Sequence, residues 1–64
     1  MRELTTVETF EVTGRGTAHV VHVGEMSPAL GDHVMLDGER CWVMGVEWPI
    51  SALGYTAILV RRVL

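Results

Sequence analysis

Short runs of alternating apolar and polar residues make up most of this sequence. Alternation with a period of two indicates half-buried strands. The predicted strands are Thr6–Thr13, Thr17–Val23, His33–Leu36, Glu39–Glu47 and Tyr55–Val63. Residues with β-branched side chains, which suit a pleated surface, are frequent in the second of these runs. No segment shows helical periodicity over three turns, so the pattern predicts an all-β fold.

Turn residues separate these runs. Gly14-Arg15-Gly16 supplies two glycines that tolerate a positive φ, so the chain can reverse or bulge there. Asp37-Gly38 is the strongest hairpin signal, because this pair accepts the primed turn between antiparallel strands. Residues Met1–Thr5 are expected to form a loose lead-in. The strands are expected to close, or nearly close, into a barrel, because closure removes unpaired sheet edges.

Three motifs carry a resemblance to a known family. They are, in chain order, Phe10-x-Val12-x-Gly14-Arg15-Gly16-Thr17, Gly31-Asp32-x-Val34-x-Leu36 and Gly45-Val46-Glu47. Together they resemble the second domain of translational GTPases such as elongation factor Tu, and the resemblance extends through the final strand. It implies one domain over residues 1–64, a small six-stranded antiparallel β-barrel. The sequence departs from the family at Met26, where a turn glycine is usual, and in the shortened connection Trp48–Leu53.

The resemblance also implies a candidate RNA-binding surface. The family's second domain helps hold the aminoacylated 3′ end of transfer RNA, together with a GTPase domain that is absent from these 64 residues. Thr56 stands where elongation factor Tu has an asparagine, which removes two amide donors. An RNA-end or ribosome-associated accessory protein is therefore the alternative function. Its candidate residues are Phe10, Gly14, Arg15, Glu47, Arg61 and Arg62.

The composition favours a contact with protein. Hydrophobic residues make up 48% of the chain, and a barrel of this size cannot bury all of them. Trp42 and Met44 share a strand face, which points outward if Val43 and Val46 face the interior with Gly45 as a bulge between them. Tryptophan, methionine and arginine are enriched in interface cores. The predicted partner-binding patch is Arg40, Trp42, Met44 and Trp48; the alternative is that one tryptophan plugs an end of the barrel.

Charge and cysteine content restrict the class of protein. The net charge of −3 argues against non-specific binding to a phosphate backbone, which needs clustered basic residues. The single cysteine, Cys41, excludes an intramolecular disulfide and fits a reducing cytoplasm. No apolar run approaches the length of about 18 residues that a membrane span needs, and no secretion signal is recognised. A cytoplasmic protein without a membrane segment is expected.

Residues that could carry chemistry lack a supporting pattern. His19 and His22 are three residues apart, so on a strand they point to opposite faces, which weakens a zinc site with Cys41. The Gly14–Thr17 loop lacks the lysine and the following helix of a nucleotide-binding loop. We therefore expect no catalytic residue, metal, cofactor or nucleotide. The expected function is a non-catalytic module that binds a protein partner or another copy of itself as a homo-oligomer.

Overall fold

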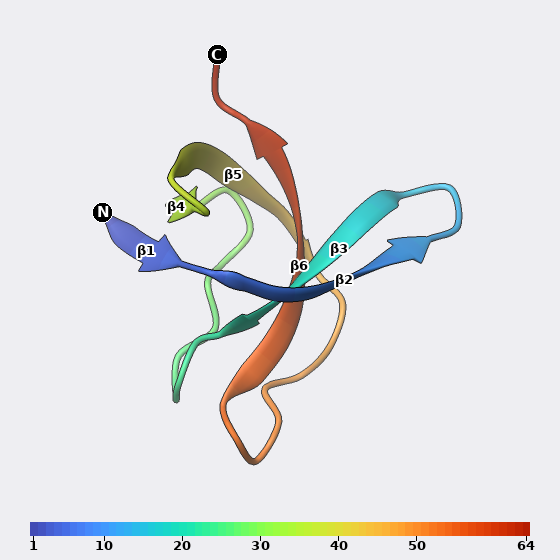
Figure 1. Cartoon of the computed structure of the whole chain (residues 1–64), viewed down its shortest axis with the longest axis vertical. Coiled ribbons are helices and arrows are strands. Elements are labelled where there is room, and N and C mark those ends of the chain that lie inside the picture. Colours follow the sequence, from blue (N-terminus) through green and yellow to red (C-terminus); the bar gives the residue numbers. More distant parts are fainter.

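The computed structural model describes residues 1–64, which form one curled sheet of six strands (Figure 1). The strands are β1 (Arg2–Leu4), β2 (Thr6–Val12), β3 (Gly16–His22), β4 (His33–Leu36), β5 (Glu39–Val46) and β6 (Tyr55–Arg62). Their order across the sheet is β1-β4-β5-β6-β3-β2. The all-β prediction is confirmed, and every predicted strand lies within one residue of its expected bounds. No helix of a length and apolarity that could cross a membrane is found.

Strand β1 corrects the prediction for the first residues. The expected lead-in Met1–Thr5 contains a strand that pairs in parallel with β4, with Leu4 opposite Leu36. The side chain of Leu4 is buried in the core. The sheet is therefore mixed, and the expected fully antiparallel arrangement is wrong. Three residues are too few for a period-two pattern to be recognised, so only the pairing with β4 reveals this strand.

The two edges of the sheet belong to consecutive strands. Thr5 alone separates β1 from β2 in the chain, although β1 forms one edge of the sheet and β2 forms the other. The sheet therefore curls until one residue connects its edges, and Figure 1 shows β1 and β2 following one another across the front. No hydrogen-bonded ladder joins β1 to β2, so the result is a half-barrel rather than a closed barrel.

Asp37 holds the corner between β1 and β2. Its Oδ1 accepts a hydrogen bond from the backbone N–H of Thr6 at 2.7 Å, and its Oδ2 accepts one from the Thr6 hydroxyl at 2.5 Å. Its own backbone N–H donates to the carbonyl of Leu4 at 3.0 Å. The Thr6 hydroxyl, and after it the Thr6 backbone N–H, lower the pKa of the Asp37 carboxyl, with a smaller contribution from His19. The turn of the β4–β5 hairpin is thereby fixed to the start of β2.

Apolar residues are buried on both faces of the sheet. The inner cluster is Leu4, Val21, Val23, Val34, Leu36, Cys41, Val43 and Ile58. The outer cluster is Ala18, Val20, Ala57 and Leu59, with Phe10, Val12 and Tyr55 packed against it. Neighbouring residues of a strand point to opposite faces, so Val20 and Val21 belong to different clusters. Strands β3 and β6 are consequently covered on both sides.

We expect Asp37→Ala to lower the free energy of unfolding by about 1 kcal/mol at neutral pH, because it removes two hydrogen bonds to an exposed carboxylate. The folded pKa of Asp37 lies below its ordinary value of 3.8. Its contribution is therefore complete above that value and is lost as the pH falls through the folded pKa. Urea unfolding at neutral pH and near pH 3, about one unit below the ordinary value, measures both effects.

Glu25→Ala is the control for this substitution, because Glu25 is an exposed loop acid. It should leave the free energy of unfolding almost unchanged at both pH values. A difference between Asp37→Ala and the unaltered protein that stays constant down to the acid limit would contradict the role given to the Asp37 carboxylate.

Candidate functional site

Trp42 and Met44 are exposed on the outer face of β5. Their exposed fractions are 40% and 47%, and the predicted outward orientation of both side chains is confirmed. Trp42 stacks on His33 of β4 with ring centroids 5.6 Å apart, and Arg40 Nη2 lies 3.3 Å from His33 Nδ1. Arg61 of β6 lies directly opposite Trp42 and shares a depression with Met44. We call Arg40, Trp42, Met44 and Arg61 the β5 patch.

A bulge in β5 follows these two residues. The register between β5 and β6 shifts between Val43 and Gly45, which confirms the predicted bulge. Val43 is buried, and Val46 lies opposite the buried Ile58, so both valines belong to the inner face. Val46 is nevertheless 37% exposed, because it ends its strand at the rim of the half-barrel. Met44 points outward because it follows the inward-facing Val43, and the bulge after it places Gly45 on the outer face and returns Val46 to the inner one.

Trp48 contacts a different part of the surface from the rest of the predicted patch. Its ring stacks on Phe10 of β2, with centroids 5.1 Å apart and an interplanar angle of 13°. Its carbonyl accepts a hydrogen bond from the Thr56 hydroxyl at 2.6 Å. Phe10 packs against the outer cluster, and 42% of Trp48 stays exposed. Trp48 thus covers Phe10, which packs on the outer cluster, and does not continue the row of Trp42 and Met44.

Arg15 and Glu47 form an ion pair above Gly45. Arg15 Nη1 lies 3.0 Å from Glu47 Oε1, and the exposed fractions of the two side chains are 56% and 18%. Glu47 Oε1 is buried and has no hydrogen-bond partner of regular geometry, so the charge contact with Arg15 is its polar interaction. A Cβ on Gly45 would lie 3.1 Å from Arg15 Nη2 and 3.4 Å from Leu59 Cδ1. The glycine therefore makes room for the arginine over this part of the sheet.

Most of the residues predicted for RNA binding lie around the outer face. Phe10, Ala18, Leu59 and Gly45 are successive partners in one row across β2, β3, β6 and β5. Gly14, Arg15 and Arg61 line a shallow depression of about 400 Å³ together with Met44, Leu59 and Val60. Arg62 does not join them. Its Nε lies 2.6 Å from Glu39 Oε2, on the opposite face of β6 from Arg61.

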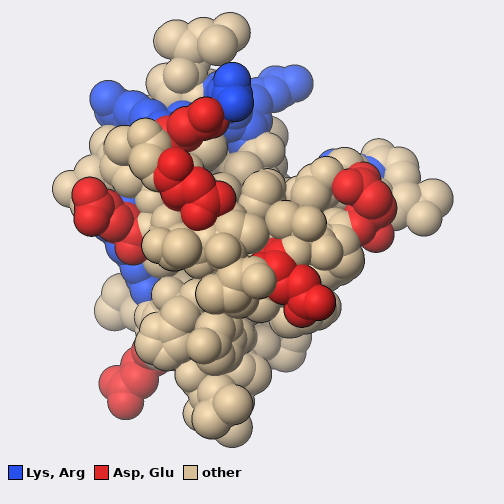
Figure 2. Space-filling view, in the orientation of Figure 1, with Lys and Arg blue, Asp and Glu red and all other residues tan.

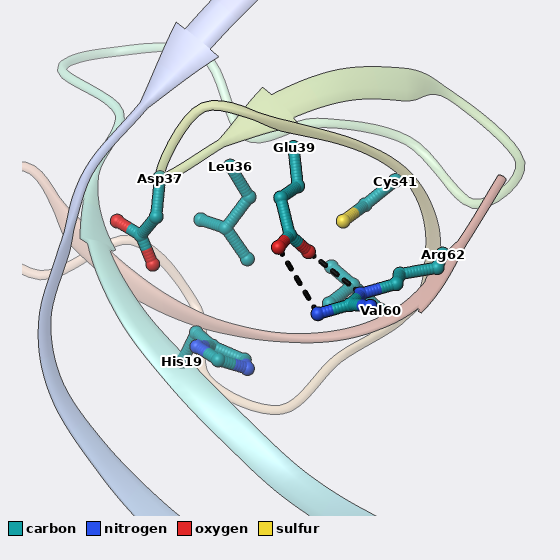
Figure 3. Close-up of a pocket in the computed structure, with 7 residues that line it drawn as sticks. All are labelled: His19, Leu36, Asp37, Glu39, Cys41, Val60 and Arg62. Atoms are coloured by element: carbon teal, nitrogen blue, oxygen red, sulfur yellow. Dashed lines mark hydrogen bonds and ion pairs between the residues drawn. The ribbon is translucent and has the colours of Figure 1, made fainter.

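A second pocket, of about 300 Å³, opens between the β4–β5 hairpin and the end of β6 (Figure 3). It is lined by His19, Leu36, Asp37, Glu39, Cys41, Val60 and Arg62. Burial, and to a smaller extent Glu39, raises the pKa of the Cys41 thiol, so the thiol is protonated at neutral pH and is a poor nucleophile. No three histidine, cysteine or acidic side chains lie close enough to hold a metal ion.

Comparison of the chain with models of protein families, with curated proteins and with solved structures finds no match. The resemblance to the second domain of translational GTPases therefore depends on the sequence motifs alone.

Sequence reasoning missed His33 as the partner of Trp42. A signal for it was available, because the Asp37-Gly38 turn sets the register of the hairpin. Counting outward from this turn pairs Leu36 with Glu39 and, three positions further, His33 with Trp42. Residues directly opposite in a sheet share a face, so the stacking of the two rings follows from the turn.

We expect Gly45→Ala to fold and to push Arg15 away from Glu47, because the flexible end of Arg15 yields more easily than the sheet backbone. In an Arg15→Ala background the obstacle is missing, so the same glycine substitution should cost less stability. The coupling between the two positions should reach about 0.5 kcal/mol, measured as unfolding free energies in a double-mutant cycle. An equal cost of Gly45→Ala in both backgrounds would show that Arg15 does not occupy this space in solution.

Proposed function

We propose that this chain is a non-catalytic binding module whose β5 patch docks on a protein surface, either of a partner or of another copy of the chain. The observation that carries the proposal is the outward pair Trp42 and Met44, exposed by 40% and 47% and flanked by Arg40 and Arg61. These are the residue types that supply most of the binding energy in protein interfaces.

The β5 patch stands on a rigid base, which supports this role. Strand β5 is paired on both sides, with β4 and with β6, so its backbone loses little freedom on binding. The stacking of Trp42 on His33 orders the indole before contact. The two arginines, Arg40 at the end of the row on β5 and Arg61 beside Trp42 on β6, suit a partner surface that places carboxylates around an apolar pocket.

We expect Trp42→Ala to weaken association by about tenfold or more, as for an interface anchor, while the protein stays folded because the indole lies outside both buried clusters. Light scattering of untagged protein over a wide concentration range measures the self-associated form. Leu53→Ala is the control, because Leu53 is 78% exposed in a loop away from β5. Unfolding of Trp42→Ala, or an equal effect of Leu53→Ala, contradicts the proposal.

RNA-end binding is the second candidate, and one specific observation favours it. Phe10 and Glu47, which the resemblance implies for such a pocket, lie around the same outer face as the candidate phosphate contacts Arg15 and Arg61. The Glu47 carboxylate, 18% exposed and paired with Arg15, is the acceptor for a ribose hydroxyl in this candidate, and the stack of half-buried Phe10 with exposed Trp48 offers an aromatic surface. Arg15 and Arg61 would contact phosphates.

A gel shift with aminoacylated and with bare transfer RNA tests this second candidate. Binding should fall steeply as salt rises, because phosphate contacts release counterions. Glu47→Gln should weaken binding of the aminoacylated form, while Glu25→Gln, in an exposed loop, should not. The absence of salt-sensitive binding to either RNA would remove this candidate and leave the protein-docking proposal untouched.

A further inference from the structure

Strand β2 is an edge of the sheet whose outer side has no strand beside it. The sheet order ends at β2, which pairs only with β3. At the turn into β3 the carbonyl of Val12 accepts a hydrogen bond from the N–H of Arg15 at 2.9 Å. The polar backbone groups of Val12, and two residues earlier those of Phe10, therefore point toward β3. Those of the alternate residues Thr9 and Glu11 point to the open side.

The open stretch has defined ends. At its start, Asp37 binds the backbone N–H of Thr6 and blocks the approach of another strand. At its end, the chain turns through Thr13–Arg15 into β3. Figure 1 shows the β2–β3 hairpin projecting away from the rest of the sheet. The residues between Thr6 and Thr13 leave room for an added segment of about five residues in extended conformation.

Acidic side chains accompany this open edge. Glu8 and Glu11 are exposed and lie on opposite faces of β2. Glu3 is exposed on β1, which precedes β2 in the chain. Strand β2 itself contains no basic residue. Figure 2, in which β2 faces the viewer, shows acidic residues spread over this side, whereas most of the visible basic residues lie along its upper margin.

The same charges argue against a second copy of this chain as the added strand. Two β2 strands side by side would bring the two glutamates of each copy together without a basic residue between them, and like charges across a strand pair are destabilising. Charged residues on edge strands are a known means of preventing such pairing. A basic segment meets no such repulsion, and its cationic side chains can pair with Glu8 on one face of β2 and with Glu11 on the other.

We propose that β2 takes up an extended basic segment of a protein partner as an additional strand. The backbone groups of Thr9 and Glu11 supply the hydrogen bonds, and the carboxylates of Glu8 and Glu11 select a segment with arginine or lysine on both faces. This is recognition by strand addition. It uses a different strand from the β5 patch and is independent of the proposed function.

The probe is the acetylated, amidated heptapeptide Arg-Val-Arg-Thr-Val-Arg-Val, which carries arginine on both faces, titrated into the isotope-labelled 64-residue chain. Amide shifts should concentrate in β2, and the N–H groups of Thr9 and Glu11 should exchange more slowly with solvent. The same peptide with glutamate in place of arginine should not bind. The variant carrying both Glu8→Gln and Glu11→Gln should bind the basic peptide about fivefold more weakly, as expected for two exposed ion pairs. Equal binding of both peptides, or shifts confined to the β5 patch, overturns the proposal.

A backbone substitution tests the hydrogen bonds separately from the charges. The chain can be assembled chemically by ligation at Cys41, with the amide N–H of Thr9 replaced by an ester oxygen. This N–H is not used within the sheet, so the fold should persist, and peptide affinity should fall by about fivefold, as for one lost hydrogen bond. An ester at Leu53, in an exposed loop, is the control and should bind normally. Unchanged affinity of the Thr9 ester would overturn strand addition even where the charge dependence holds.

Discussion

The reciprocal hydrogen bonds between Asp37 and the corner formed by Leu4 and Thr6 connect the two edges of this sheet. The first strand pairs with β4 and the next with β3, so the chain must cross from one edge to the other within one residue. Asp37 can act from both its backbone and its side chain because it lies at a φ of 52° in a tight turn, a conformation that aspartate tolerates better than most residues. The corner keeps Leu4 in the inner cluster. In a chain of 64 residues, the small core makes each such side chain important.

The curl also divides the surface into parts with different properties. On the outer face, Phe10 packs on the cluster over β3 and β6 and carries the stacked ring of Trp48, while Trp42 and Met44 on β5 stay exposed. At the edge, Asp37 contacts only Thr6, at the start of β2. The outer side of the β2 backbone after Thr6 has no strand paired with it. An apolar patch between arginines and an acidic strand edge are therefore separate surfaces, and each suits a partner of different charge.

The strands could be predicted because their period-two patterns and turn signals are local, and the Gly45 bulge followed from two valines that both needed to face inward. Features that depend on contacts distant in sequence could not be predicted. Strand β1 has a single buried residue and exists through its pairing with β4. Trp48 lies on Phe10, nearly forty residues earlier, and no local pattern indicates that contact. Arg61 and Arg62 are a different case, since their adjacent positions on one strand already required opposite faces.

Hydrogen exchange of the Thr6 and Asp37 amides tests the central claim about the corner most directly. Both N–H groups are hydrogen-bonded only across it, one to the Asp37 carboxylate and the other to the Leu4 carbonyl. If the corner holds the sheet edges together, both amides exchange slowly and approach the rate of the amide of Ile58, a fully buried residue. Exchange of Thr6 and Asp37 at the rate of an unstructured chain, while Ile58 stays protected, would show that the edges separate without disturbing the core and would contradict this account.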